Sequence, residues 1–172
     1  FITFKYHLRY NENRKFHELN DINLNKAVSA KNIDKSLNGL LWINPFFEGD
    51  PNQEISYIKL GQKQLESSKK QIMLISHYSF LDSITEKKLN YPNKSFTFEG
   101  ASMPIQEGKF FEKYKKFLFK KIDNNKIEEI YFFKHENISR KIIETYFSQE
   151  CYKLEENNIF YIYKIQCLKW FL

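Results

Sequence analysis

Between residues 71 and 147 the sequence alternates short apolar runs with longer amphipathic ones, and this rhythm constrains the fold most. The run QIMLISH at 71–77 is almost continuously apolar, as the buried strands of parallel sheets are. The alternation predicts strands at 71–77, 95–99 and 127–134, and helices at 79–88, 107–124 and 138–147. Strands and helices in this order form βαβ crossovers. We therefore predict an α/β fold of three layers, with helices on both faces of a mostly parallel sheet.

The C-terminal part of the sequence predicts a hairpin. Two apolar stretches at 151–154 and 159–165 flank the polar segment EENN at 155–158. Strand-like runs joined by a short polar loop usually pair antiparallel. We expect this hairpin to form an antiparallel edge of the sheet.

The patterns before residue 50 are weaker. Residues 1–10 alternate apolar and polar side chains, which predicts a strand, and the polar segment that follows is expected to wrap the surface. A weak helix is predicted at 27–37, ended by Asn38 and Gly39. A short strand is predicted at 40–44.

Two helices carry local signals of their own. Asp50 and Pro51 are the residue types of a helix cap and a first helical position, so a helix should run from 52 to 68. In the helix at 107–124 one stripe consists of Phe110, Tyr114, Phe117 and Lys121. We interpret this stripe as the buried side of an amphipathic helix whose lysines face solvent.

The length of 172 residues predicts a single domain, residues 1–172, and the 42% apolar fraction is enough for a hydrophobic core. The chain begins at Phe1 with a predicted strand and no Met, so we expect it to be excised from a longer protein. Cys151 and Cys167 could form one disulfide or stay reduced; we favour free thiols, because two strands need not bring them within bonding distance.

Polar residues follow three of the predicted strands, where the ligand crevice of a parallel sheet lies. The candidate catalytic residues are His77, Glu99, His135 and Glu136. Two imidazoles and two carboxylates could run acid–base chemistry or hold a divalent metal. The interpretation that we favour is that these are ordinary polar residues at the ends of buried strands, and we predict no metal site.

Six further residues are candidates for ligand binding: Arg9, Arg14, His17, Trp42, Tyr78 and Asp82. The two arginines suit an anionic substrate or lipid head group, although they could equally pin the polar segment to the sheet, and we favour that structural role. Trp42 could stack on a sugar ring, but core packing is the commoner role. Tyr78 and Asp82 follow the strand at 71–77.

Several classes of function are disfavoured. The sequence contains neither GxGxxG nor GxxxxGK[ST], so nucleotide binding is disfavoured and no cofactor is expected. The segment ISHYS around Ser76 lacks the glycines of a hydrolase nucleophile turn, which disfavours a serine hydrolase. The net charge of +6 comes mainly from scattered lysines, which argues against a nucleic-acid partner. No apolar run approaches the length of a membrane span.

Five phrases occur in order along nearly the whole chain: KYHLRYNENRKFHEL, AKNIDKSLNGLLWINP, QIMLISHYSFLDSI, YPNKSF and KFFEKYKKFLFKKI. This set resembles the C-terminal soluble domain of a group of bacterial polytopic membrane proteins. Their membrane portions look like lipid-linked-sugar glycosyltransferases of the multi-span, mannosyltransferase-like type. The resemblance implies that transmembrane helices precede Phe1 and act as partner of this domain, which would be extracytoplasmic and membrane-anchored through them.

The resemblance implies a non-catalytic accessory domain that positions a glycan or lipid-linked sugar, because catalysis in that class uses acidic residues in membrane loops. Sugar-binding modules of related enzymes are often rich in β-structure, whereas this chain reads as α/β. Two alternatives stay open. One is a free-standing small enzyme that uses the histidines and glutamates at the strand ends. The other is an interaction module whose Lys-rich helix at 107–124 meets an anionic membrane surface or another chain.

Overall fold

The computed structural model describes residues 4–5, 23–93, 103–136 and 141–167. The chain divides into two compact units, Phe1–Ile55 and Ser56–Leu172. The predicted strand at 95–99 lies outside the described residues. Of the predicted strand at 1–10 only Phe4 and Lys5 are described, and they are helical, so the strand prediction is wrong at these two positions.

The first unit holds a two-stranded antiparallel sheet, in which β1 (Val28–Ser29) pairs with β2 (Leu41–Trp42). Three short 3₁₀ helices accompany it: η3 (Leu24–Lys26), η4 (Ala30–Asn32) and η5 (Lys35–Leu37). The predicted single helix at 27–37 is therefore wrong, although the predicted stop at Asn38 and Gly39 is confirmed.

A side-chain contact explains why the helix is broken. The Asp34 carboxylate accepts hydrogen bonds from the backbone N–H of Ser36 at 2.8 Å and from its hydroxyl at 2.6 Å. Asp and Ser side chains that bind nearby backbone groups in this way compete with the α-helical pattern. Gly39, with φ of +90°, then reverses the chain into β2.

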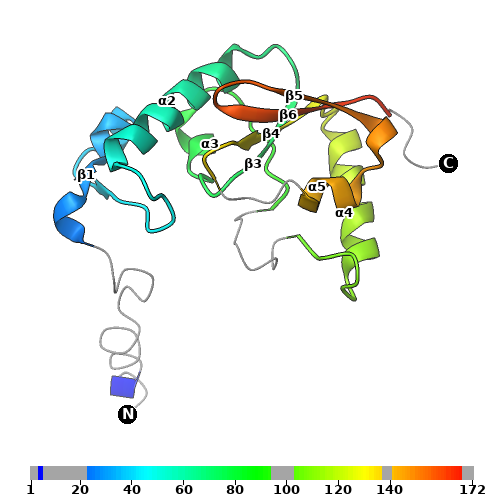
Figure 1. The fold of residues 1–172 in the computed structure, drawn as a ribbon, viewed down its shortest axis with the longest axis horizontal. Coiled ribbons are helices and arrows are strands. Elements are labelled where there is room, and N and C mark those ends of the chain that lie inside the picture. The colour runs from blue at the N-terminus through cyan, green and yellow to red at the C-terminus, as the bar shows by residue number, and fades with distance from the viewer. Residues whose placement is uncertain (1–3, 6–22, 94–102, 137–140, 168–172) are drawn as a thin grey trace. The chain divides into compact units, whose positions relative to one another are not determined.

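The second unit is built on a mixed four-stranded sheet (Figure 1). Its strands are β3 (Ile72–Ile75), β4 (Glu129–Phe133), β5 (Tyr152–Glu156) and β6 (Phe160–Ile165), in the order β3-β4-β6-β5. β3 and β4 are parallel, while β6 pairs antiparallel with both β4 and β5. The predicted C-terminal hairpin is confirmed, and β5 is its edge strand.

Four α-helices and one 3₁₀ helix complete the described part of the chain beyond residue 50: α2 (Pro51–Ser67), α3 (Leu81–Ile84), α4 (Phe111–Asn124), α5 (Lys141–Tyr146) and η6 (Gln149–Cys151). The predicted cap of α2 is confirmed, because Asp50 Oδ1 accepts the N–H of Asn52 at 2.7 Å. Helices and a mixed sheet are in keeping with the α/β class. Among the described strands of the four-stranded sheet only one of three pairings is parallel, so this sheet is mixed and not mostly parallel, while the three-layer arrangement stays a prediction.

α2 packs on the sheet at Gly61. A Cβ atom at this glycine would lie 2.3 Å from the Phe133 ring and 3.1 Å from the Phe160 ring. Helix and strands therefore approach more closely than any larger residue would allow.

α4 and α5 share a separate core cluster with the sheet (Figure 1). The strands contribute alternate residues to it: Met73, Ile75, Ile130, Phe132 and Tyr163. The rings of Phe111 on α4 and Tyr146 on α5 lie 4.8 Å apart between centroids.

The buried side of α4 differs from the predicted stripe. The buried residues are Phe111, Leu118, Phe119 and Ile122. In contrast, the side chains of Phe110 and Phe117 are 61% and 50% exposed. The amphipathic helix is confirmed. The predicted buried stripe is wrong at Phe110 and Phe117, whereas Tyr114 is partly buried against the core cluster.

Cys151 and Cys167 form a disulfide, with Cα atoms 4.8 Å apart. The prediction of free thiols is wrong. Cys151 ends η6 directly before β5, and Cys167 lies just after β6, so the antiparallel pairing of the two strands brings the cysteines together.

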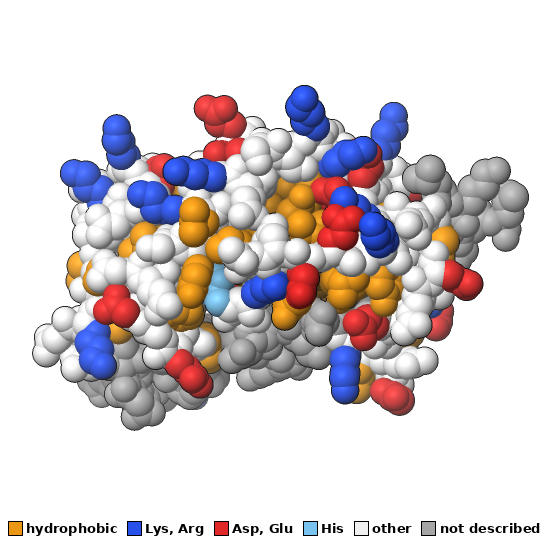
Figure 2. All heavy atoms as spheres, turned by 45° about the horizontal axis from the view of Figure 1, so that its top comes forward, with side chains coloured by type: hydrophobic (Ala, Val, Ile, Leu, Met, Phe, Trp, Pro, Cys, Tyr) orange, Lys and Arg blue, Asp and Glu red, His pale blue; other side chains and the backbone are white. Residues whose placement is uncertain are grey.

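The glutamates of the β5–β6 hairpin are paired with lysines of the hairpin and with the lysine that follows β4. The Glu155 carboxylate contacts Lys164 Nζ at 2.6 Å and Lys153 Nζ at 3.2 Å, and Glu156 contacts Lys134 Nζ at 3.1 Å. On the face drawn in Figure 2, basic and acidic side chains are likewise interspersed, with apolar side chains between them. Because charges of both signs alternate on it, such a surface produces no strong electrostatic potential of one sign.

Candidate functional site

The structure brings together the polar residues that follow β3 and β4. Because these strands are parallel, their carboxyl ends meet at one edge of the sheet, as the sequence predicts. Glu136 Oε1 accepts a hydrogen bond from the backbone N–H of His77 at 2.6 Å. Glu136 is only 9% exposed, so its carboxylate ties the two strand ends together from inside the protein.

His135 lies in an aromatic environment at the same edge. Its Nε2 and the Tyr78 hydroxyl share a hydrogen bond of 2.8 Å, and the Tyr57 ring stacks on the imidazole with centroids 5.0 Å apart. Phe133 contacts it edge-on at 5.1 Å. Burial lowers the pKa of His135 to about 4, so the imidazole is neutral at pH 7.

These contacts favour a structural role for the strand-end residues. Tyr78, a predicted ligand-binding residue, is 2% exposed and packs against His135. Glu99 lies outside the described residues. Within the described ranges no group of three or more His, Cys, Asp or Glu side chains could hold a metal ion. The catalytic roles of His77, Glu99, His135 and Glu136 stay predictions.

A polar pocket of about 440 Å³ opens beside this edge. It is lined by Ser79, Asp82, Ser83, Lys88, Asn90, Tyr91, Asn93, Lys121 and Asn125. The first three residues follow β3, the next four lie on the segment after α3, and the last two come from α4 and the residue after it. The volume lies in the range of small-molecule sites, about 300–1,000 Å³.

The walls of this pocket are fixed by hydrogen bonds. Asp82 Oδ1 accepts the N–H of Leu89 at 3.0 Å, and the Asn90 side chain donates to the carbonyl of Ile72 in β3 at 2.9 Å. Asn90 has a positive φ of 48°, which turns the chain at the pocket wall. Asp82 is thus the predicted ligand-binding residue that the structure places in a cavity.

Two tyrosines anchor the pocket to the core. The Tyr91 hydroxyl donates to the carbonyl of Tyr78 at 2.8 Å, and burial, reinforced by Asp82 and Glu136, raises its pKa far above the usual value. The Tyr114 hydroxyl donates to Asn93 Oδ1 at 3.0 Å, and burial raises its pKa to about 12. Both hydroxyls therefore stay protonated and serve as fixed donors.

Two lysines give the pocket a positive wall. Lys121 Nζ donates to the carbonyl of Pro92 at 3.2 Å, and Lys88 Nζ lies 3.4 Å from Asn125 Oδ1. Burial, and secondarily the charge of Lys88, lowers the pKa of Lys121. Two ammonium groups that influence each other in this way favour an anionic group between them.

Trp42 lies in the first unit and makes a contact that the sequence does not suggest. Its indole N–H donates to Glu54 Oε2 at 2.7 Å, and the Asn44 side chain donates to Glu54 Oε1 at 2.6 Å. Glu54 has no exposed surface. The predicted sugar-stacking role of Trp42 stays untested, since the observed contact holds the indole edge in the protein.

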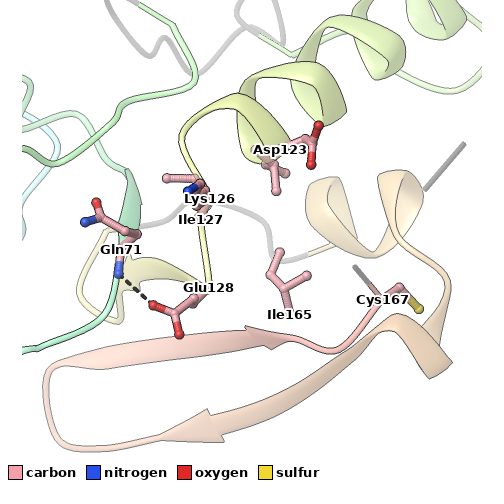
Figure 3. Close-up of a pocket in the computed structure, with 8 residues that line it drawn as sticks. Gln71, Asp123, Lys126, Ile127, Glu128, Ile165 and Cys167 are labelled. Carbon is pink, nitrogen blue, oxygen red and sulfur yellow. Dashed lines mark hydrogen bonds between the residues drawn. The ribbon is translucent and has the colours of Figure 1, made fainter. Parts of the chain in front are cut away.

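A second cavity of about 390 Å³ lies at the opposite, amino-terminal end of β3 and β4 (Figure 3). Ile122, Ile127 and Ile165 make it mostly apolar. Glu128 points toward Gln71 and accepts its N–H at 3.1 Å, and it also pairs with Lys70 at 2.7 Å. These contacts hold the carboxylate at the rim, and the cavity offers little directed chemistry to a ligand.

Sequence reasoning found one residue of the polar pocket and missed eight. Asparagine, serine and lysine are abundant in this chain and carry no spacing signal, so the pocket was not predicted; the turn-forming residue types at 90–93 are the one signal that could have marked it. Arg9, Arg14 and His17 lie outside the described residues.

None of the helices in the described part of the chain combines the length and hydropathy needed to cross a bilayer. Comparison of the chain with protein-family models, with curated proteins and with solved structures finds no match.

Proposed function

We propose that this chain is a non-catalytic accessory domain of a membrane glycosyltransferase-like protein, and that it positions a glycan or lipid-linked sugar in the polar pocket beside α3. The proposal includes the three-layer arrangement, with helices on both faces of the sheet, that the sequence predicts. The observation that carries it is the pocket lining, which combines a carboxylate, two ammonium groups, three amides and three hydroxyls. Hydroxyl-rich ligands need many fixed donors and acceptors of this kind.

The pocket chemistry favours a sugar that carries a negative charge. Lys88 and Lys121 supply positive charge on one wall, and Asp82 accepts hydroxyl donors on another. A phosphorylated sugar, or the phosphate of a lipid-linked sugar, would neutralise the two lysines. The Tyr91 ring adds an apolar surface of the kind on which a sugar can pack.

The disulfide supports an extracytoplasmic position. Disulfides persist in secreted and periplasmic environments and are rare in the cytosol. The Cys151–Cys167 bond is therefore compatible with the side of the membrane that the family resemblance implies. Hydropathy of the complete gene tests the membrane part of the proposal: several apolar spans of about 20 residues upstream of Phe1 are expected, and their absence would remove it.

Amide NMR titration tests the pocket. Glucose, mannose, N-acetylglucosamine and glucose 1-phosphate are added separately, and shifts are expected around Asp82, Asn90 and Asn93, largest for the phosphorylated sugar. Ser83→Tyr, which fills the pocket from an exposed position, should abolish these shifts, whereas Ser67→Tyr at the end of α2 should preserve them.

A second variant separates charge recognition from shape. Lys88→Ala should weaken the binding of glucose 1-phosphate about tenfold, as the loss of one charge-assisted contact does, and should change the binding of the neutral sugars little. Shifts scattered over the protein, or none with any of the four sugars, would overturn the proposal.

A further inference from the structure

The outer face of α4 consists of lysine and phenylalanine. We define the α4 outer face as Lys109, Phe110, Lys113, Phe117, Lys120 and Lys121. At 3.6 residues per turn Lys113, Phe117, Lys120 and Lys121 fall on one side of the helix, and the buried residues Phe111, Leu118 and Ile122 fall on another, while Lys109 and Phe110 directly precede the first turn. The two acidic residues of α4, Glu112 and Asp123, project from a neighbouring sector outside this face.

The two phenylalanines are unusually exposed for their type. Phe110 is 61% and Phe117 is 50% exposed, although phenylalanine is among the residue types most often buried. Lysines lie over both rings: Lys109 Nζ is 5.6 Å from the centre of Phe110, and Lys121 Nζ is 5.9 Å from that of Phe117. Apolar rings and ammonium groups therefore share one patch.

The charges of this face lack the compensation seen elsewhere in the unit. On the β5–β6 hairpin, Lys153 and Lys164 pair with Glu155, and Lys134, which follows β4, pairs with Glu156. Among the described residues, in contrast, no carboxylate forms a salt bridge with Lys113 or Lys120, which are both exposed. Within the described residues, the lysines of the α4 outer face thus form a cluster without salt bridges.

We propose that the α4 outer face docks on an anionic lipid surface. Lysines near such a surface are attracted by its negative potential, and aromatic side chains insert at the level of the head groups. Phe110 caps the start of α4 and Phe117 lies in its second turn, and both rings are exposed, so we expect both to enter the interface while the flanking lysines contact lipid phosphates. An acidic protein would complement the lysines, but it gives less reason for two exposed rings among them.

This surface adjoins the proposed sugar pocket without depending on it. Lys121 belongs to the α4 outer face and also lines the pocket. Docking would therefore hold the pocket opening close to the head groups, where the sugar of a lipid-linked substrate is found. The vesicle experiment below contains no sugar, so its failure and the failure of the pocket proposal can be told apart.

Cosedimentation of the 172-residue chain with vesicles tests the inference. Binding is expected to vesicles of phosphatidylcholine with phosphatidylglycerol, and to fall steeply as salt is raised, while pure phosphatidylcholine vesicles bind little. Each lysine near the surface contributes roughly a fivefold gain in binding. Lys113→Glu combined with Lys120→Glu should therefore lower vesicle affinity by more than about 25-fold.

A matched control separates this face from net charge. Lys59 and Lys63 are exposed on α2, and reversing both makes the same change in net charge. The Lys59→Glu, Lys63→Glu double variant should lower vesicle affinity by less than about threefold, because these lysines lie outside the docked face. Replacing Phe110 and Phe117 with alanine should weaken binding at high salt as well as at low salt, because it removes the apolar contribution.

Three results would overturn the inference. The first is an equal loss of vesicle affinity in the α2 and α4 double variants. The second is equal binding to neutral and anionic vesicles, and the third is no binding to anionic vesicles at low salt. A face that binds poly-glutamate but not these vesicles would be a protein-docking surface, and that result also counts against a lipid partner.

Discussion

The Glu136 carboxylate, which follows β4, accepts the backbone N–H of His77, which follows β3, at 2.6 Å. This side chain fixes the ends of two parallel strands that are joined by more than fifty residues of chain. A carboxylate that accepts a backbone N–H is one of the stronger kinds of protein hydrogen bond. The contact therefore stabilises the edge of the sheet on which the polar pocket opens.

We predict that Glu136→Ala lowers the free energy of unfolding by about 2–3 kcal/mol, because it leaves a buried backbone N–H unsatisfied. Glu136→Gln keeps an acceptor and should cost only about 1 kcal/mol, the loss of charge assistance. Urea denaturation followed by circular dichroism measures both. Equal stabilities for the two variants and the wild type would show that the hydrogen bond contributes nothing.

Reduction of the disulfide should destabilise the second unit. The bond between Cys151 and Cys167 closes a loop with a sequence separation of 16, for which chain entropy predicts about 3 kcal/mol. A Cys151→Ser, Cys167→Ser double variant should therefore unfold at lower urea concentration than the oxidised protein, and dithiothreitol should not change it further. Two reactive thiols in the native protein, counted with Ellman's reagent, would contradict the bond.

His135 should make stability depend on pH. Its pKa of about 4 in the folded protein lies below the ordinary value of 6.5, so the unfolded chain takes up the proton first as the pH falls. Stability is unaffected above pH 6.5, declines between about pH 6.5 and 4 by at most about 3 kcal/mol, and levels off below that range. Because the imidazole is partly exposed, the loss should be smaller than this limit.

Comparison with His135→Gln isolates this histidine. Glutamine can still accept the Tyr78 hydroxyl but does not titrate, so the stability difference between the two proteins should shrink as the pH falls from 7 to 4. Urea midpoints across that range measure the difference, and the NMR shift of the imidazole protons reports the pKa directly. A parallel pH dependence in both proteins would assign the titration to another group.

The strands of the second unit could be predicted because their patterns are local. The continuous apolar run of β3 and the polar break between β5 and β6 appear directly in the sequence, and the parallel pairing that follows from the alternation places His77 and Glu136 at one edge. The features that the sequence analysis predicted wrongly depend on contacts that the apolar and polar pattern does not contain. The Asp34–Ser36 hydrogen bonds replace a weak helix with 3₁₀ turns, and the β5–β6 pairing brings two cysteines together.

The candidate site could be predicted less well than the fold. Its strand-end residues follow from topology, whereas the pocket depends on where α4 and the segment after α3 lie against β3. Asn90 and Asn93 are ordinary turn residues in the sequence, and only the hydrogen bonds to Ile72 and Tyr114 make them parts of a wall. Such long-range contacts have no periodic signature along the chain.

The register of α4 supplies a direct test of which stripe is buried. Phe117 is 50% exposed and Leu118 is fully buried, although they are neighbours with similar apolar character. Phe117→Asp should change the free energy of unfolding by less than about 1 kcal/mol, as exposed substitutions usually do. Leu118→Asp places a carboxylate among Met73, Phe111 and the other members of the core cluster, and it should prevent stable folding. Thermal melts followed by circular dichroism compare the two. If Phe117→Asp unfolds the protein while Leu118→Asp is tolerated, the buried stripe predicted from the sequence is the right one, and the α4 outer face loses the exposed ring on which lipid docking depends.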